Sequence, residues 1–191
     1  NSGIEYSPEL EQDFHAKFGE LAQHKDNAGV VKERQLKAPV HTFTDASFGV
    51  TYKELRSISG VIIFLHGTPV AWKSKVQSVF AGSTSEAEWI AMSDGIQLAE
   101  GVHRVSDFLI GREQPRGPIW CDNRSALLCG RKGIENSNEI PKRTRHVALR
   151  FVRVLGEADR LWFTPTDEQM ADGMTKSCNA QALKNMFKQF D

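Results

Sequence analysis

Four acidic residues have the types and settings needed to bind metal ions. Asp45 lies in HTFTDAS, Glu88 in STSEAEWIAM, Asp122 in PIWCDN and Asp172 in TDEQMADGMTK. Mg²⁺ prefers oxygen ligands, and two ions held ~3.5–4 Å apart can stabilise both the attacking and the leaving oxygen of a phosphoryl transfer. Without cations, four close carboxylates would raise one another's pKa values by repulsion. If the fold brings them together, these acids predict a two-metal nuclease site.

Each acid also has a local alternative. Asp45 before Ala-Ser is typical of a turn, and Asp122 could cap the helix that follows it. Ser83 and Glu86 have the spacing of a capping box, so Glu86 is expected to serve the helix N-terminus, which leaves Glu88 as the ligand. The joint pattern of four acids favours the metal site over these separate explanations.

The elements that must position the acids follow from hydrophobic patterning. Residues 40–48, 58–65 and 69–78 predict three strands of an antiparallel meander, with turn signals between them. Residues 84–110 predict a long core helix, despite two glycines, because apolar residues recur at helical spacing. Its expected buried side carries Ala87, Ile90, Ala91, Leu98, Val102, Val105 and Leu109.

The second half of the chain predicts shorter elements. PIWCD is expected to form a buried strand and SALLCG a short helix. TRHVALRFVRVLGEA is expected to form another helix and DRLWFTPT the last strand. The order of elements places Asp45 and Asp122 at strand ends, with Glu88 on a helix and Asp172 near the start of a late helix.

This order of acids, with AEWIAM after the first hairpins, resembles the ribonuclease H domain of reverse transcriptases. A finer resemblance is to copia-type LTR retrotransposons, through SGVIIFLHGTPVAWKSKVQSVFAGSTSEAEWIAMSDG, CDN, RTRHVALRF and PTDEQMADGMTK. The resemblance covers roughly residues 40 to 178. It implies an α/β, RNase H-like fold: a mixed five-stranded sheet with its first three strands antiparallel and helices on both faces.

The resemblance also implies an activity. We expect a metal-dependent endoribonuclease that hydrolyses the RNA strand of RNA·DNA hybrids during reverse transcription and leaves 5′-phosphate ends. Its catalytic metal ligands would be Asp45, Glu88, Asp122 and Asp172, binding two Mg²⁺ ions for which Mn²⁺ can substitute. The expected partners are the hybrid and the reverse transcriptase polymerase domain of a parent polyprotein, with no membrane.

Selection of the RNA strand requires contacts to 2′-hydroxyl groups. Ser83, Thr84 and Asn123 match family positions that approach the RNA strand. Each of them could instead cap a helix. The sequence leaves both roles open.

Basic residues that could contact the nucleic-acid backbone fall in two places. Lys73 and Lys75 could lie along the DNA strand, with Trp72 on the opposite face of the same β-strand and core packing as its alternative role. Net charge is zero, but residues 131–153 carry seven Lys or Arg against two Glu and form a basic stretch. That stretch contributes the remaining predicted contacts, Arg143, Arg145 and His146.

His146 has a second possible role. Cellular and retroviral RNases H often carry a His in the loop before the last Asp, and PTDEQMA has none. His146 is the nearest candidate to replace it, since an imidazole can contact phosphate or shuttle a proton. A structural role on its helix is the alternative.

Composition predicts one compact domain with an N-terminal arm. The 191 residues are 40% hydrophobic, which is ordinary for a globular protein. We expect an arm or linker over residues 1–38 and the RNase H domain over 39–191. Leu10, Phe14 and Phe18 have helical spacing in the arm, which either tethers the polymerase or packs on the domain. DNAGVVKERQLKAP is expected to be a linker.

Cysteine usage and hydropathy predict the compartment. Three cysteines without CxxC spacing indicate free thiols in a reducing environment. GVIIFL is too short to cross a bilayer, and no signal segment opens the chain. We expect an intracellular, cytoplasmic protein within a virus-like particle. The initial Asn fits a fragment, a processed product or an excised piece better than a complete gene product.

Other protein classes fit less well. Integrases and transposases share the fold, but their third essential acid is characteristically Glu rather than an Asp such as Asp172. A proofreading exonuclease would carry Asp-x-Glu on its first strand, where this chain has Asp45-Ala46-Ser47. The remaining alternative is a catalytically weak or domesticated RNase H-fold module that binds nucleic acid or a polymerase partner. Retention of all four acids favours the enzyme.

Overall fold

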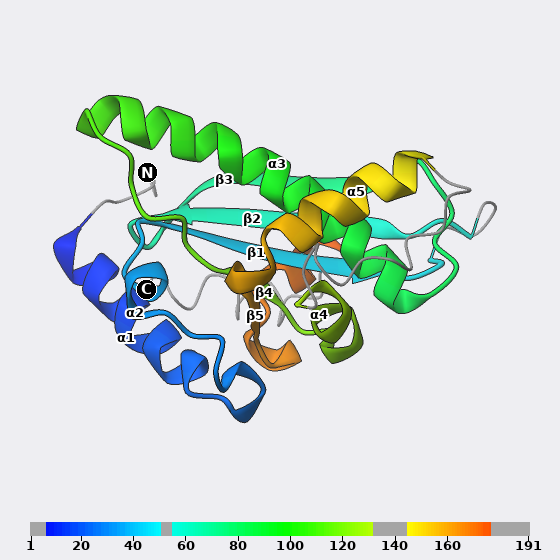
Figure 1. Ribbon diagram of the computed structural model, residues 1–191, viewed down its shortest axis with the longest axis horizontal. Coiled ribbons are helices and arrows are strands. Elements are labelled where there is room, and N and C mark those ends of the chain that lie inside the picture. Colours follow the sequence, from blue (N-terminus) through cyan, green and yellow to red (C-terminus); the bar gives the residue numbers. More distant parts are fainter. Residues whose placement is uncertain (1–6, 51–54, 132–144, 177–191) are drawn as a thin grey trace.

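A computed structural model describes residues 7–50, 55–131 and 145–176 of the chain (Figure 1). A five-stranded sheet has the order β3-β2-β1-β4-β5. The strands are β1 (Val40–Ser47), β2 (Ile58–Leu65), β3 (Thr68–Val76), β4 (Ile119–Cys121) and β5 (Leu161–Phe163). The first three pair antiparallel, whereas β4 is parallel to β1 and β5 is parallel to β4. This is the mixed sheet that the sequence predicts.

The register of the sheet brings the ends of β1 and β4 together. Phe43 on β1 pairs with Trp120 on β4, so the residues that follow each of them lie side by side. On the other side of β1, Asp45 pairs with Gly60 of β2. A Cβ atom on Gly60 would lie 2.7 Å from a methyl carbon of Thr175, so only glycine lets this late segment pack closely on β2.

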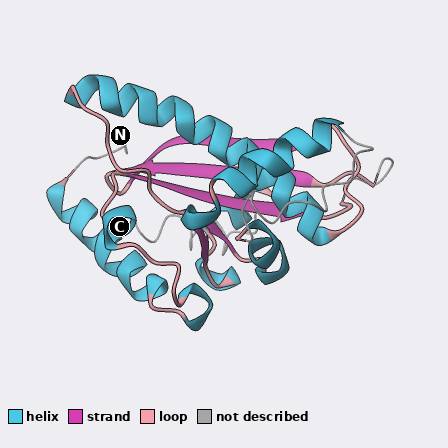
Figure 2. Cartoon of the chain, in the orientation of Figure 1, coloured by secondary structure: helices cyan, strands magenta, loops and turns pink. Residues whose placement is uncertain are grey.

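Figure 2 shows helices packed around the strands of the sheet. Three of them, α3 (Thr84–Ile110), α4 (Arg124–Gly130) and α5 (Arg145–Gly156), share one core cluster with β4 and β5 on one face. A Cβ atom on Gly95 would lie 2.5 Å from the Thr44 methyl carbon, so glycine allows α3 to pack close to β1. The predicted buried side of α3 is wrong at its end, because Val105 is 60% and Leu109 73% exposed.

The opposite face is covered by α1 (Pro8–Ala22), which is the amphipathic helix predicted for the arm. The Ser7 side chain caps its N-terminus by accepting from the Leu10 N–H at 3.1 Å. Phe14 and Phe18 are buried against an aromatic cluster on the sheet, made of Phe43, Phe64, Trp120 and Trp162. Helices therefore cover both faces. The tether role of the arm stays a prediction.

The segment expected to be a linker contains structure. It includes part of the 3₁₀ helix η1 (Lys25–Asn27) and all of the short helix α2 (Glu33–Leu36). Asn27 is fully buried and Gln35 is 3% exposed. Burial of polar side chains at these positions requires specific partners, and these connect the segment to the rest of the domain.

The predicted late helix around Asp172 is instead a series of 3₁₀ turns. They are η4 (Thr166–Glu168) and η5 (Met170–Met174), while a further 3₁₀ turn, η3 (Ala158–Arg160), lies between α5 and β5. Met170 and Ala171 are buried against the aromatic cluster, which anchors η5 under the sheet. Across the described ranges, no helix combines the length and apolarity needed to cross a membrane.

Candidate metal centre and nucleic-acid surface

The four predicted acids meet at the end of the central strands. Asp45 lies near the end of β1 and Glu88 in the second turn of α3, each only 4% exposed. Asp122 follows β4 directly, and Asp172 lies in η5. Carboxylate oxygens of Glu88 and Asp122 and the Sγ of Cys121 lie within 4.8 Å of one another. Asp45 is close enough to Asp122 and Asp172 for their charges to raise its pKa.

Burial and mutual repulsion govern the ionisation of this cluster. Burial, followed by the charges of Asp45 and Asp122, raises the pKa of Glu88 to about 9. Burial likewise raises the pKa of Asp45 to about 6, against the opposing effect of a hydrogen bond from Thr175. Two neighbouring acids with raised pKa values are stabilised in their ionised form when cations bind to them. An all-carboxylate donor set also suits hard divalent ions, so the residues fit Mg²⁺.

Three polar contacts orient the carboxylates. The Thr166 hydroxyl donates to Asp122 Oδ2 at 2.8 Å, and the Thr175 hydroxyl donates to Asp45 Oδ2. Lys176 pairs with Asp172 one helical turn away. Sequence reasoning missed the two threonines, although both lie in or beside the PTDEQMADGMTK motif that predicted Asp172.

Cys121 is a further member of the cluster that sequence reasoning missed. It is fully buried, and its Sγ lies 3.7 Å from Glu88 Oε2. Burial, followed by the charge of Glu88, raises the pKa of the thiol, so it remains protonated and donates to the carboxylate. Cys121 and Cys129 are free thiols as predicted, whereas Cys178 lies outside the described residues.

The helix caps are made by residues other than the predicted metal ligands, so capping does not explain Asp122 or Glu88. Asn123, not Asp122, caps α4, with its Oδ1 accepting from the Ala126 N–H at 3.0 Å. At the start of α3, Ser83 Oγ accepts from the Glu86 N–H at 3.1 Å, while Glu86 accepts from the Gly82 N–H at 2.7 Å. Capping is thus carried out by other groups, and the carboxylates of Asp122 and Glu88 remain in the cluster.

The predicted nucleic-acid contacts have different surroundings. Ser83 and Thr84 are exposed at the N-terminus of α3, near Glu88 in sequence. Asn123 is half-buried and engaged as a cap. Arg143 lies outside the described residues, and Arg145 and His146 are described only as the first residues of α5.

The third strand presents both a basic and an aromatic side chain. Lys73 lies 3.2 Å from Asp94 of α3, so it faces the helices, and Lys75 is exposed. Trp72 pairs with Ile62 and points to the opposite face, as strand alternation predicts. Against the described residues, the Trp72 side chain is 60% exposed. The alternative prediction that Trp72 packs in the core is therefore wrong.

The sequence comparisons match Pol polyproteins of retrotransposons. No family model matches the sequence. The chain is similar to the retrovirus-related Pol polyprotein from transposon RE1 of Arabidopsis thaliana, at 27% identity over 164 residues. It is also similar to that from transposon TNT 1-94 of Nicotiana tabacum, at 28% identity over 138 residues. The resemblance to retrotransposon polyproteins is confirmed.

The matches span most of this chain and little of its relatives. They cover 83% of the chain but 11% of the RE1 polyprotein, and 70% of the chain but 10% of the TNT 1-94 polyprotein. A Ty1 Gag-Pol polyprotein of Saccharomyces cerevisiae matches at 28% identity over 74% of this chain and 8% of its own length. The chain therefore corresponds to a small part of each polyprotein.

Among solved structures, the chain is similar to bacterial and metagenomic RNase H domains. One is the N-terminal RNase H domain of a Mycobacterium tuberculosis protein, with a TM-score of 0.48 and 12% identity, covering 81% of this chain and 99% of that one. Another is an RNase H1 isolated from compost, with a TM-score of 0.47 and 16% identity, covering 76% and 99%.

Proposed function

We propose that this chain is a metal-dependent ribonuclease H that hydrolyses the RNA strand of RNA·DNA hybrids during reverse transcription. The observation that carries the proposal is the convergence of four carboxylates at one end of the sheet, two of them buried with raised pKa values. Such a cluster destabilises the protein unless cations bind to it. Similarity to Pol polyproteins supports the biological setting.

Asp45, Glu88, Asp122 and Asp172 would hold two Mg²⁺ ions, for which Mn²⁺ can substitute. A metal pair held by these residues would supply the positive charge needed for in-line attack by water and for departure of the 3′ oxygen, so the product would carry a 5′-phosphate. The protein's own part is to orient the ligands through Thr166 and Thr175 and to bury them. Because Glu88 must lose its proton to act as a ligand, metal binding should strengthen as pH rises toward 9.

Recognition of the hybrid would use the surface around this centre. The exposed hydroxyls of Ser83 and Thr84 are suited to the 2′-hydroxyls of the RNA strand. Phosphates would be contacted by Lys75 and by the basic residues at the start of α5. Lys73 would contact a phosphate only if its ion pair with Asp94 breaks. The polymerase domain of a parent polyprotein and a virus-like particle remain the proposed partner and location.

The test is cleavage of an end-labelled RNA·DNA hybrid with Mg²⁺ or Mn²⁺, beside RNA·RNA and DNA·DNA duplexes. We expect metal-dependent cutting of the RNA strand of the hybrid alone, with 5′-phosphate ends. Asp122→Asn should abolish cutting, whereas Asp13→Asn, on the exposed face of α1, should cut as the wild type does. A folded wild type that binds hybrid and cuts nothing with either ion would support the non-catalytic binding module instead.

A further inference from the structure

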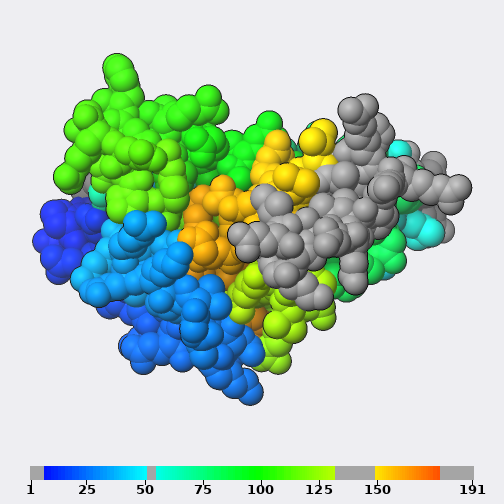
Figure 3. Space-filling model, viewed as in Figure 1, coloured from blue at the N-terminus to red at the C-terminus, as the bar shows by residue number. Residues whose placement is uncertain are grey.

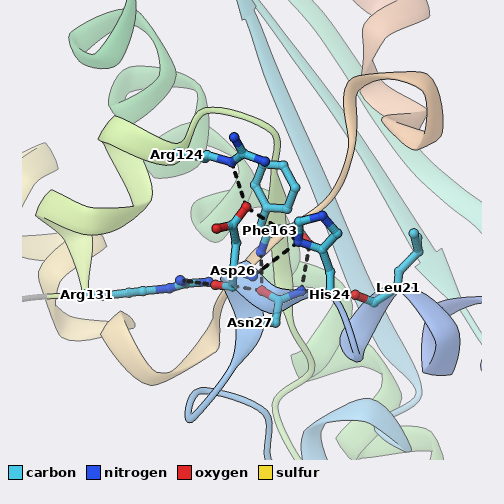
Figure 4. Close-up of polar contacts among 7 residues, drawn as sticks. All are labelled: Leu21, His24, Asp26, Asn27, Arg124, Arg131 and Phe163. Carbon is cyan, nitrogen blue, oxygen red and sulfur yellow. Dashed lines mark hydrogen bonds and ion pairs between the residues drawn. The ribbon is translucent and has the colours of Figure 1, made fainter.

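The short helix η1 contacts the start of α4, through Arg124, and the end of β5, through Phe163 (Figure 4). Asp122 lies between β4 and α4, and the Thr166 hydroxyl that donates to it follows β5. From η1, Asp26 reaches the first residue of α4, and Asn27 reaches the last residue of β5. In the space-filling view, this part of the N-terminal segment lies against α4 at the surface (Figure 3).

Asn27 binds the edge strand as a neighbouring strand would. Its Nδ2 donates to the Phe163 carbonyl oxygen at 2.8 Å, and its Oδ1 accepts from the Phe163 N–H at 2.6 Å. Nδ2 also donates to the Leu21 carbonyl at 3.2 Å, and Oδ1 accepts from Arg131 at 3.1 Å. The side chain is fully buried, and both bonds to Phe163 are buried with it. The Asn27 amide thus provides hydrogen-bond partners for both the N–H and the carbonyl oxygen of Phe163, at the end of β5.

Asp26 holds α4 at both ends of that helix. Its Oδ2 accepts from Arg124 Nε at 2.6 Å, and its backbone carbonyl accepts from Arg131 at 2.6 Å. The Arg124 guanidinium also lies 4.9 Å from the centre of the Phe163 ring. Arg124 comes two residues after Asp122, so its anchoring restricts where the Asp122 backbone can move.

The held end of β5 is close in sequence to the group that orients Asp122. Thr164, the residue after Phe163, donates its N–H to the Cys121 carbonyl at 3.1 Å. Two residues later, the Thr166 hydroxyl donates to Asp122 Oδ2. So short a connection transmits any displacement of Phe163 to Thr166. A continuous set of bonds therefore runs from Asn27 through β5 to a carboxylate of the metal centre.

We propose that Asn27, assisted by Asp26, is a positioning residue of the metal centre, which fixes Asp122 through Phe163 and Thr166. The proposal rests on the proposed function, in which Asp122 binds metal. It makes residues 26 and 27, which precede the motifs quoted for residues 40 to 178, part of the nuclease rather than of a tether. Partners that orient a metal ligand typically change metal affinity by about 10- to 100-fold when they are removed.

The experiment is calorimetric titration of the full chain with Mg²⁺ alone, on Asn27→Ala, Thr166→Val and the double variant. Each single change should weaken binding about tenfold. Both changes act through the same hydrogen bond to Asp122, so the double variant should bind Mg²⁺ about tenfold more weakly than wild type. Independent effects would instead multiply to a loss of about 100-fold in affinity. Lys32→Ala is the matched control, since it removes an ion pair between the same N-terminal segment and Asp159, in η3. It should leave affinity unchanged.

Wild-type affinity in folded Asn27→Ala, or multiplicative weakening in the double variant, would overturn the proposal. Circular dichroism and thermal unfolding report whether each variant is folded. If Asn27→Ala does not fold, Asn27→Asp replaces it in the same cycle, because it keeps the Oδ1 acceptor for the Phe163 N–H and loses the Nδ2 donation to the Phe163 carbonyl. A wild type that neither binds Mg²⁺ nor cuts hybrid refutes the proposed function and this inference together, whereas a competent wild type with unaffected variants refutes the inference alone.

Discussion

Replacing Glu88 by Gln should stabilise the metal-free protein at neutral and alkaline pH while it removes metal-dependent cleavage. Glu88 is 4% exposed, and burial is the main cause that raises its pKa from an ordinary 4.5 to about 9. Gln has nearly the same shape and cannot ionise. The variant therefore removes a group that the folded state disfavours as a carboxylate.

The size of the effect follows from the difference between folded and unfolded pKa values. The unfolded chain loses the Glu88 proton near pH 4.5, whereas the folded protein keeps it until about pH 9. Stability from this group is therefore complete below pH 4.5 and is lost as pH rises toward 9. At 1.36 kcal/mol per pH unit, the loss by pH 7 is about 3 kcal/mol. We expect Glu88→Gln to recover about that much at pH 7 and little at pH 4.5.

The assay is urea unfolding in EDTA at several pH values between 4.5 and 9. Wild type should lose free energy of unfolding relative to Glu88→Gln as pH rises across this range. Glu86→Gln is the matched control, because it changes a helix-capping carboxylate two residues away and should keep the wild-type pH dependence. A constant difference between Glu88→Gln and wild type across the range would refute the electrostatic reasoning.

Three further predictions concern packing and the nucleic-acid surface. Gly95→Ala should destabilise the protein by about 1–3 kcal/mol in chemical denaturation, because its Cβ would meet Thr44. Gly101→Ala should stabilise it by about 0.5–1 kcal/mol, because a Cβ there meets nothing within 4 Å. Equal effects of the two substitutions would contradict the close packing of α3 on β1. Phe18→Ala should cost about 3–5 kcal/mol, measured by the same unfolding, and a loss below about 1 kcal/mol would mean that α1 does not cover the sheet in solution. Lys75→Ala should leave the melting temperature unchanged and reduce the slope of log hybrid affinity against log salt concentration by about 0.9, and an unchanged slope would remove it from the binding surface.

Sequence patterns predicted most elements well because those patterns are local. β2 and α3 have the bounds that the hydrophobic pattern predicted, and the cap at Ser83 matches its signal. The segment around Asp172 differs from the predicted helix, because its described part forms the 3₁₀ helix η5, with Met170 and Ala171 buried under the sheet. The burial predicted for Leu109 on α3 was also wrong, and Trp72 on β3 is exposed, since exposure depends on where the sheet and its covering helices stop.

The sequence by itself predicted which four acids belong together and the elements that carry Asp45, Glu88 and Asp122, because strand ends, helix periodicity and caps are set by neighbouring residues. Only the tertiary structure decided what surrounds those acids. The partners of Asp122 and Asp45 are 44 and 130 residues away, and the Asn27 contacts with β5 span 136 residues. Such contacts have no local signal, because they arise from strand order and helix packing. The raised pKa values of Asp45 and Glu88 are likewise properties of burial, which exists only once the chain has folded.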